Sequence, residues 1–340
     1  MKSPASHRDG ARIVVTHRPF PETIDLLRTA GTVIAPKNAE AFTPSERRRY
    51  AAAADALLAF MPDRVDDRLL AACPRLRIVA GALKGYDNFD ARACARRGVW
   101  LTIVPDDLTV PTAELTIGLM IALARHFRAG DAHVRSKAFR GWRPQFYGKG
   151  LAGSQIGLVG LGAIGRALAE RLRGFGADVS YGDQRPAGAA TERRLGLTRR
   201  PLGALLARSD FVVLGLPLTT STLGLIDERA LRRMKLGAYL VNPARGSIVD
   251  EAAVLRALDS GRLAGYAADV FAFEDLARAD RPRRIPPRLL AHPRTLFTPH
   301  LGSAVVEMRR RIELCAARNV VDALMGRRPR DAVTSGDVHR

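Results

Sequence analysis

The chain has 340 residues and a mass of 36.9 kDa, which exceeds one comfortable hydrophobic core and predicts two domains. Hydrophobic residues make up 47% and charged residues 26%, which excludes a disordered or collagen-like chain. The net charge of +20 comes almost entirely from arginines that are spread along the chain in pairs and triplets. We interpret them as solvated helix faces rather than as a nucleic-acid surface.

The sequence also predicts the compartment. Its start contains no apolar stretch of signal-peptide length, and the apolar run 115–124 is too short to cross a bilayer. The three cysteines, Cys73, Cys94 and Cys315, match no zinc or redox spacing and suit a reducing cytosol. We therefore expect a cytoplasmic protein with no membrane contact and no metal site.

The first hundred residues alternate between short apolar runs and helical stretches, which is typical of a parallel α/β sheet. Helix starts are marked by Thr43-Pro44 and by Asp66. The expected strands cover residues 12–16, 32–35, 55–60, 76–80 and 99–104.

A buried helix is expected after Thr109–Thr112, running through Glu114 to about Arg128. After a polar, aromatic-rich loop over 135–149, a second alternating series begins. Six strands are expected, which with their intervening helices indicate a dinucleotide-binding fold. They cover residues 155–160, 177–181, 210–215, 238–242, 263–268 and 295–298.

One long helix is predicted over residues 303–325, with Gly326 as its C-terminal stop. Because this helix can return to the first half, both chain ends are expected to form one domain. The predicted fold class is therefore α/β with two Rossmann-like domains. One domain is expected to consist of residues 1–108 and 299–340, and a doubly wound domain of residues 109–298 is inserted in it.

A glycine motif carries the first chemical signal. Gly160, Gly162 and Gly165 directly follow an expected strand and open a helix. The first glycine permits a tight turn, the second lets backbone amides approach a pyrophosphate, and the third packs helix against strand. The alternative is a purely structural turn.

Asp183 closes the next expected strand, where a carboxylate accepts hydrogen bonds from the adenosine ribose. This position favours NAD because the carboxylate repels a 2′-phosphate. Arg185 could accommodate that phosphate, so NADP stays a weaker alternative.

Three polar residues follow later strands, where ligands bind in such sheets: Arg245, Glu274 and His300. An arginine clamps an anion, a carboxylate orients an imidazole, and an imidazole moves a proton. Taken singly, each could equally be a surface or capping residue.

Together these motifs make the chain similar to the D-isomer-specific 2-hydroxyacid dehydrogenase family, over nearly its whole length. The resemblance rests on Gly160–Gly165, Asn242–Gly246, Asp269–Glu274 and Pro299-His300. It implies that Arg245, Glu274 and His300 are the catalytic set, that the active site lies in a cleft, and that the protein is a homodimer. It also implies that the domain of residues 1–108 and 299–340 is flavodoxin-like and binds substrate, and that the inserted domain of residues 109–298 binds NAD.

Four longer strings resemble the phosphite (phosphonate) dehydrogenases of that family: Ala59–Asp66, Ala82–Asp90, Trp142–Gly148 and Arg278–Pro282. Most hydroxyacid members carry an apolar or small residue where Lys84 stands, and a cation suits a doubly charged oxyanion. The resemblance implies the substrate contacts Lys84, Met61, Gly85, Arg245, Trp142, Tyr147 and Ser303. It implies the cofactor contacts Thr112, Gly160, Gly162, Ala163, Ile164, Gly165, Asp183, Leu216, Pro217, Ala244 and Asp269.

The expected reaction is therefore NAD-dependent oxidation of phosphite to phosphate, with His300 as base. The alternative is an NAD(P)-dependent D-2-hydroxyacid dehydrogenase or 2-ketoacid reductase that uses the same residues on a carboxylate substrate. A more remote alternative is an NAD(H)-binding regulatory scaffold without turnover.

Overall fold

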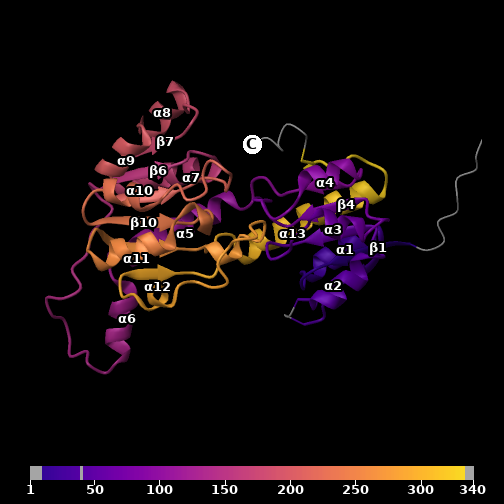
Figure 1. Cartoon of the computed structure of the whole chain (residues 1–340), viewed down its shortest axis with the longest axis horizontal. Helices are drawn as coiled ribbons and strands as arrows, with labels where there is room; N and C mark the ends of the chain where they lie inside the picture. Colours follow the sequence, from indigo (N-terminus) through magenta and orange to yellow (C-terminus); the bar gives the residue numbers. More distant parts are fainter. Residues whose placement is uncertain (1–9, 39–40, 334–340) are drawn as a thin grey trace, which may run out of the picture. The chain divides into compact units, whose positions relative to one another are not determined.

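The computed structural model describes residues 10–38 and 41–333, and it divides into two compact units (Figure 1). The end unit comprises Met1–Leu108 and Val305–Arg340, and the inserted unit comprises Thr109–Ala304. The second boundary lies later than the predicted 298/299 because backbone N–H groups of His300, Leu301 and Gly302 donate to Asp269 of the inserted unit.

The end unit is built on a five-stranded parallel sheet with the order β2-β1-β3-β4-β5. This is the flavodoxin-like strand order. The strands are β1 (Ala11–Val15), β2 (Gly31–Ile34), β3 (Ala56–Ala59), β4 (Ile78–Gly81) and β5 (Trp100–Thr102).

Helices cover both faces of this sheet. They are α1 (Pro21–Arg28), α2 (Pro44–Ala51), α3 (Asp67–Ala71), α4 (Ala91–Arg96) and α13 (Val306–Leu324). Leu27 and Ile312 pack with Ile13 on one face, and Leu70 packs with Val14 on the other. The long C-terminal helix begins at Val306 rather than at residue 303, and Gly326, with φ of +77°, follows its end.

The inserted unit contains a seven-stranded parallel sheet with the order β12-β11-β10-β9-β6-β7-β8. Its strands are β6 (Gln155–Val159), β7 (Asp178–Gly182), β8 (Leu197–Arg199), β9 (Phe211–Leu214), β10 (Ala238–Asn242), β11 (Leu263–Ala268) and β12 (Thr295–Phe297). The prediction of six strands missed β8, since this strand has three residues and two of them are exposed. The predicted fold class of two parallel α/β sheets is confirmed.

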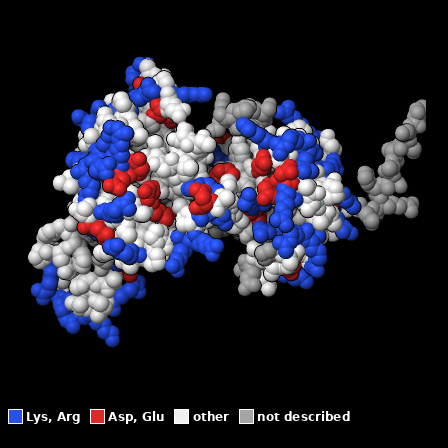
Figure 2. Space-filling model, viewed as in Figure 1, with Lys and Arg blue, Asp and Glu red and all other residues white. Residues whose placement is uncertain are grey.

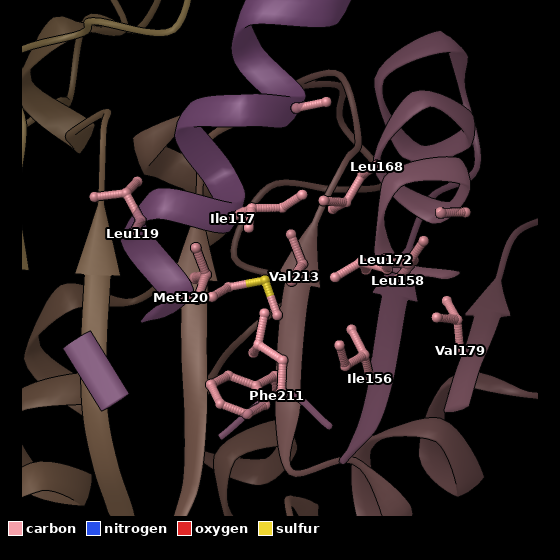
Figure 3. Packing of buried hydrophobic residues seen from close by; sticks show 14 of the residues in the cluster. Ile117, Leu119, Met120, Ile156, Leu158, Leu168, Leu172, Val179, Phe211 and Val213 are labelled. Atoms are coloured by element: carbon pink, nitrogen blue, oxygen red, sulfur yellow. The ribbon is translucent and has the colours of Figure 1, made fainter. Parts of the chain in front are cut away.

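The inserted unit also contains helices and 3₁₀ turns. They are α5 (Thr109–Ala124), α6 (Phe127–Arg135), α7 (Ala163–Leu172), η1 (Arg173–Phe175), α8 (Ala189–Leu195), α9 (Leu202–Arg208), α10 (Glu228–Arg233), η2 (Gly246–Ile248), α11 (Glu251–Asp259), η3 (Ala272–Glu274) and α12 (Pro287–Ala291). Figure 3 shows Ile117 and Met120 of α5 packed over Val213 and Phe211. The predicted first helix ends at Ala124 instead of Arg128, because His126 adopts a left-handed φ of 55°.

The positively charged side chains are distributed over the surface. Figure 2 shows Lys and Arg over the visible face, with Asp and Glu between them. Several arginines pair with carboxylates, as Arg75 does with Asp55 and Arg97 with Asp67. Among the described residues, no helix is long and apolar enough to cross a membrane.

Candidate active site

The loops at the carboxyl ends of five strands in the inserted unit carry most of the predicted site residues. All seven strands run parallel, so these loops lie along one edge of the sheet, where ligands bind in open α/β sheets. The segments that follow the strands are Gly160–Gly165 after β6, Leu216-Pro217 after β9, Ala244-Arg245 after β10, Asp269–Glu274 after β11 and His300 after β12.

The glycine loop needs its glycines for close backbone approach. Gly160 has φ of +98°, and a Cβ there would lie 2.6 Å from the carbonyl oxygen of Gly215. A Cβ on Gly165 would lie 2.7 Å from the oxygen of Gly160, whereas a Cβ on Gly162 would meet no described atom within 4 Å. The loop is thus tightly packed on the side of β9 and open at Gly162.

This open position lies at the start of α7, and it fits a dinucleotide pyrophosphate. The helix begins at Ala163, and Gly162 offers no side chain to cap its first N–H groups. Such uncapped donors, together with the helix dipole, attract a phosphate. Ala163 and Ile164 stand in the first turn, while β6 and β9 neighbour each other where the strand order reverses.

Asp183 follows β7 and is tied to the glycine loop. Its Oδ2 accepts a hydrogen bond of 2.8 Å from the backbone N–H of Leu161, and its Oδ1 accepts one of 3.1 Å from that of Arg185. These bonds fix the carboxylate beside the loop. Arg199, in the strand that the sequence did not predict, donates to the carbonyl oxygens of Asp183 and Gln184.

His300 and Glu274 form a close pair of titratable side chains at this edge. Nδ1 of His300 lies 2.8 Å from Oε2 of Glu274. The other carboxylate oxygen, Oε1, accepts a hydrogen bond of 3.0 Å from the N–H of Phe271. The carboxylate can therefore hold the imidazole in one orientation.

Asp269 holds the segment that carries His300. Its buried carboxylate accepts hydrogen bonds from the N–H groups of Leu301 and Gly302 and from the hydroxyl of Thr298. The backbone N–H of His300 donates to the carbonyl oxygen of Asp269 at 2.9 Å. The backbone of His300 adopts a left-handed conformation, with φ of 57°. Burial raises the pKa of Asp269, although these hydrogen bonds oppose that change. The residue predicted as a cofactor contact thus anchors the loop.

The backbone of Arg245 is held in place by the side chain of the fully buried Asn242. The side-chain amide of Asn242 donates to the carbonyl oxygen of Arg245 at 2.9 Å and accepts from the N–H of Ala244 at 3.1 Å. The next residue, Gly246, approaches η3 so closely that a Cβ there would lie 1.9 Å from the carbonyl carbon of Phe271. The Arg245 loop and the Glu274 loop are therefore in direct backbone contact.

Lys84, Gly85 and Met61 lie in the end unit, in the loops that follow the neighbouring strands β3 and β4. The carbonyl oxygen of Met61 accepts a hydrogen bond of 3.3 Å from the buried Asn88. Lys84 is half-buried, and burial lowers the pKa of its ammonium while the charge of Asp106 raises it. Within the described residues its ammonium makes no hydrogen bond or ion pair.

The structure does not bring Trp142 and Tyr147 to the edge that carries His300. Their segment is anchored at both ends to the opposite edge of the sheet, where the strands begin. Before the segment, the side chain of Arg128 donates to the carbonyl oxygen of Thr295 at the start of β12. After it, Lys149 forms an ion pair with Asp210, which precedes β9. Both side chains are largely exposed, at 82% and 74%. The expected pocket around them is therefore not formed by one copy of this unit.

Thr112 and Ser303 do lie at the His300 edge. A Cβ on Gly302 would be 3.1 Å from Oγ1 of Thr112, which places the start of α5 against the loop that continues to Ser303.

Asn242, Thr298 and Arg199 were not predicted as part of the site. The sequence did contain a signal for Asn242, the Asn-Pro pair at 242–243. In such a pair the asparagine side chain often forms a hydrogen bond with the backbone two residues further along the chain.

Comparison with known proteins agrees with this geometry. Residues 117–302 match the family model described as D-isomer specific 2-hydroxyacid dehydrogenase, NAD binding domain. The expected NAD cofactor is thereby confirmed for the inserted unit.

Relatives cover most of the chain. The glyoxylate reductase of Pyrococcus furiosus is 40% identical over 280 residues, which are 81% of each chain, and that of Thermofilum pendens is 38% identical over 289 residues, 81% of this chain and 80% of the other.

Solved structures are also similar. The TT0316 protein from Thermus thermophilus superposes with a TM-score of 0.86 at 34% identity, covering 95% of this chain and all (100%) of the other. The NADPH-dependent glyoxylate/hydroxypyruvate reductase from Sinorhizobium meliloti was solved with NADP and malonate. It superposes with a TM-score of 0.80 at 28% identity, covering 96% of this chain and 97% of the other. The chain belongs to the D-isomer-specific 2-hydroxyacid dehydrogenase family.

Proposed function

We propose that this chain transfers a hydride between a nicotinamide dinucleotide and a small anionic substrate, with His300 as the group that moves the proton. One observation carries the proposal: the 2.8 Å pair of His300 and Glu274 lies on the same sheet edge as the glycine loop. The bound nicotinamide supplies the hydride acceptor or donor.

Each protein group has a role that follows from its contacts. Because Glu274 is bonded to the N–H of Phe271, it holds Nδ1 of His300 in one orientation and leaves Nε2 for the substrate. Arg245 carries the guanidinium that clamps the substrate anion. Its position is maintained by Asn242 and by the close approach at Gly246.

The first candidate substrate is a 2-keto acid such as glyoxylate, because the similar proteins are named glyoxylate reductases. In this reaction Arg245 binds the carboxylate, and the carbonyl carbon receives the hydride. His300 gives its proton to the carbonyl oxygen, so that glyoxylate, NADH and one proton become glycolate and NAD. The reverse direction, oxidation of a 2-hydroxy acid, uses His300 as a base.

Phosphite is the second candidate, and Lys84 is the observation that favours it. A half-buried ammonium with no hydrogen bond or ion pair to the described residues is unfavourable unless an anion compensates its charge. Phosphite carries two charges, whereas a monocarboxylate carries one. In this reaction phosphite, NAD and water become phosphate, NADH and one proton, and His300 takes the proton of the attacking water.

We propose NAD rather than NADP as the preferred cofactor, since the carboxylate of Asp183 is positioned beside the glycine loop by two backbone N–H groups. Its oxygens retain acceptor capacity for ribose hydroxyls and repel a 2′-phosphate. We also propose that the end unit, which holds Lys84, Gly85 and Met61, is the substrate-binding domain.

A homodimer is the assembly we propose. Large apolar side chains are exposed on α6 and the loop that follows it, namely Phe127, Val134, Phe139, Trp142, Phe146 and Tyr147. Grouped apolar side chains of this kind mark interaction surfaces. A second copy that covers this segment would explain both the exposure and the distance of Trp142 and Tyr147 from their own His300 edge.

The test is a panel of initial rates followed by NADH absorbance, with glyoxylate and hydroxypyruvate as hydride acceptors and with phosphite and D-lactate as donors. Turnover of a keto acid that exceeds phosphite oxidation supports the first candidate, and the opposite order supports the second. NADH binding without turnover of any compound would contradict the proposal and would support a regulatory scaffold.

A further inference from the structure

The turn after β7 carries a guanidinium in a fixed position. Arg199, the last residue of β8, donates through Nη2 to the carbonyl oxygen of Asp183 at 3.0 Å and to that of Gln184 at 3.2 Å. The neighbouring pairing of β7 with β8 sets the position of its backbone. The side chain is therefore anchored directly over the turn that presents Asp183.

Most of the hydrogen-bonding capacity of this guanidinium is unused. A guanidinium has five N–H donors, and both of these bonds come from Nη2 alone. Within the described part of the chain, Nη1 and Nε of Arg199 have no hydrogen-bond partner, and no ion pair joins Arg199 to the carboxylate of Asp183. The side chain is exposed, so its remaining donors and its charge can reach a ligand.

Asp183 is meanwhile turned toward the glycine loop. Its two oxygens accept from the N–H groups of Leu161 and Arg185, so the carboxylate is oriented by the backbone and not by a cation. The turn thus presents a carboxylate and, separately, an anchored arginine. These are the two groups that discriminate a ribose 2′-hydroxyl from a 2′-phosphate.

We propose that Arg199 determines cofactor specificity: it supplies a fixed cation for a 2′-phosphate, so that this chain binds NADPH in addition to NADH despite Asp183. The inference rests on the proposed role of Asp183 at the ribose. An arginine suits the task because its planar fork binds a phosphate through two parallel hydrogen bonds.

Arg199 should matter more than Arg185 for this selectivity. The side chain of Arg185 is exposed and makes no hydrogen bond or ion pair to the residues that the structure describes, so it loses its rotational freedom on binding. Arg199 has already lost that freedom by bonding the two carbonyl oxygens. A charged pair formed by a preorganised group is stronger than one formed by a mobile group.

The experiment measures the dissociation constants of NADPH and NADH by titration calorimetry, without substrate, for the wild type and three variants. In Arg199→Met we expect NADPH to bind about tenfold to a hundredfold more weakly, with NADH changed by less than about twofold. Arg199→Lys retains the charge and should recover part of the NADPH affinity. Arg173→Met is the matched control, because Arg173 is an exposed arginine that also donates to a carbonyl oxygen, that of Arg194.

Three outcomes contradict the inference. Unchanged NADPH affinity in Arg199→Met would exclude a phosphate contact. Equal weakening of NADH and NADPH, together with a lower melting temperature, would mean that Arg199 only supports the turn. Wild-type protein that binds NADH and not NADPH would also overturn it. By contrast, wild-type protein that binds neither dinucleotide would contradict the proposed function itself.

Discussion

His300 Nδ1 lies 2.8 Å from Glu274 Oε2, with the two side chains 31% and 26% exposed. The imidazole is therefore oriented by a carboxylate and still open to solvent or substrate on its other side. Glu274 cannot turn away from His300 without also breaking its hydrogen bond to the N–H of Phe271. The backbone hydrogen bond from His300 to Asp269 fixes the segment that carries the ring.

Replacement of His300 by alanine removes the proton-transfer group. We expect kcat to fall by roughly 10² to 10⁴, the range typical of a lost general acid or base. NADH affinity, measured by fluorescence titration, should change by less than about twofold, because the glycine loop is untouched. Near wild-type turnover of His300→Ala would remove this residue from the mechanism.

Glu274→Gln should lower kcat without abolishing activity. The amide oxygen can still accept a hydrogen bond from Nδ1 of His300, but the bond is no longer assisted by a carboxylate charge, so the ring is held less firmly. The loss should be smaller than that in His300→Ala. Initial rates at saturating substrate measure it, and an unchanged kcat would show that the pair does not act as a unit.

Lys84→Met tests the substrate assignment. If the ammonium contacts a doubly charged oxyanion, KM for phosphite should rise by at least about tenfold, while KM for NAD stays nearly constant. Saturation curves at fixed NAD measure both values. If the wild type does not oxidise phosphite and the variant keeps full glyoxylate reduction, Lys84 belongs to the structure of the loop and the keto-acid candidate alone remains.

Gly246→Ala should damage both stability and activity. The added Cβ would lie 1.9 Å from the backbone of Phe271, so η2 and η3 must separate, and Arg245 moves with η2. We expect a lower melting temperature and a lower kcat/KM. Gly174→Ala is the matched control, since a Cβ there meets no described atom within 4 Å. Equal melting temperatures for both variants would contradict the close approach.

Much of this architecture could be predicted from local sequence, because strands and phosphate loops carry strong short-range signals. Gly160–Gly165 directly follows an apolar strand, and the structure has that strand and helix where the motif implies them. The three-residue strand β8 could not be found, since it is formed by pairing with β7 rather than by its own pattern. Arg199 was missed with it.

The neighbours of the candidate site were harder to predict than its chemically obvious members. Asn242 and Asp269 act through hydrogen bonds to backbone groups of loops, which depend on how the loops fold. The assignment of the aromatic loop stays a prediction. Trp142 and Tyr147 were assigned to the pocket by resemblance alone, whereas the path of α5 takes their segment to the far edge of the sheet.

Direct transfer of the hydride is the central claim, and isotope labelling tests it most directly. Wild-type protein should be incubated with glyoxylate and NADH deuterated at C4, and separately with P-deuterated phosphite and NAD, and the products analysed by mass spectrometry. The account predicts that deuterium moves without loss to solvent, into glycolate in the first case or into NADH in the second, for at least one of the two pairs. Binding of the dinucleotide with no label transfer in either pair would contradict it.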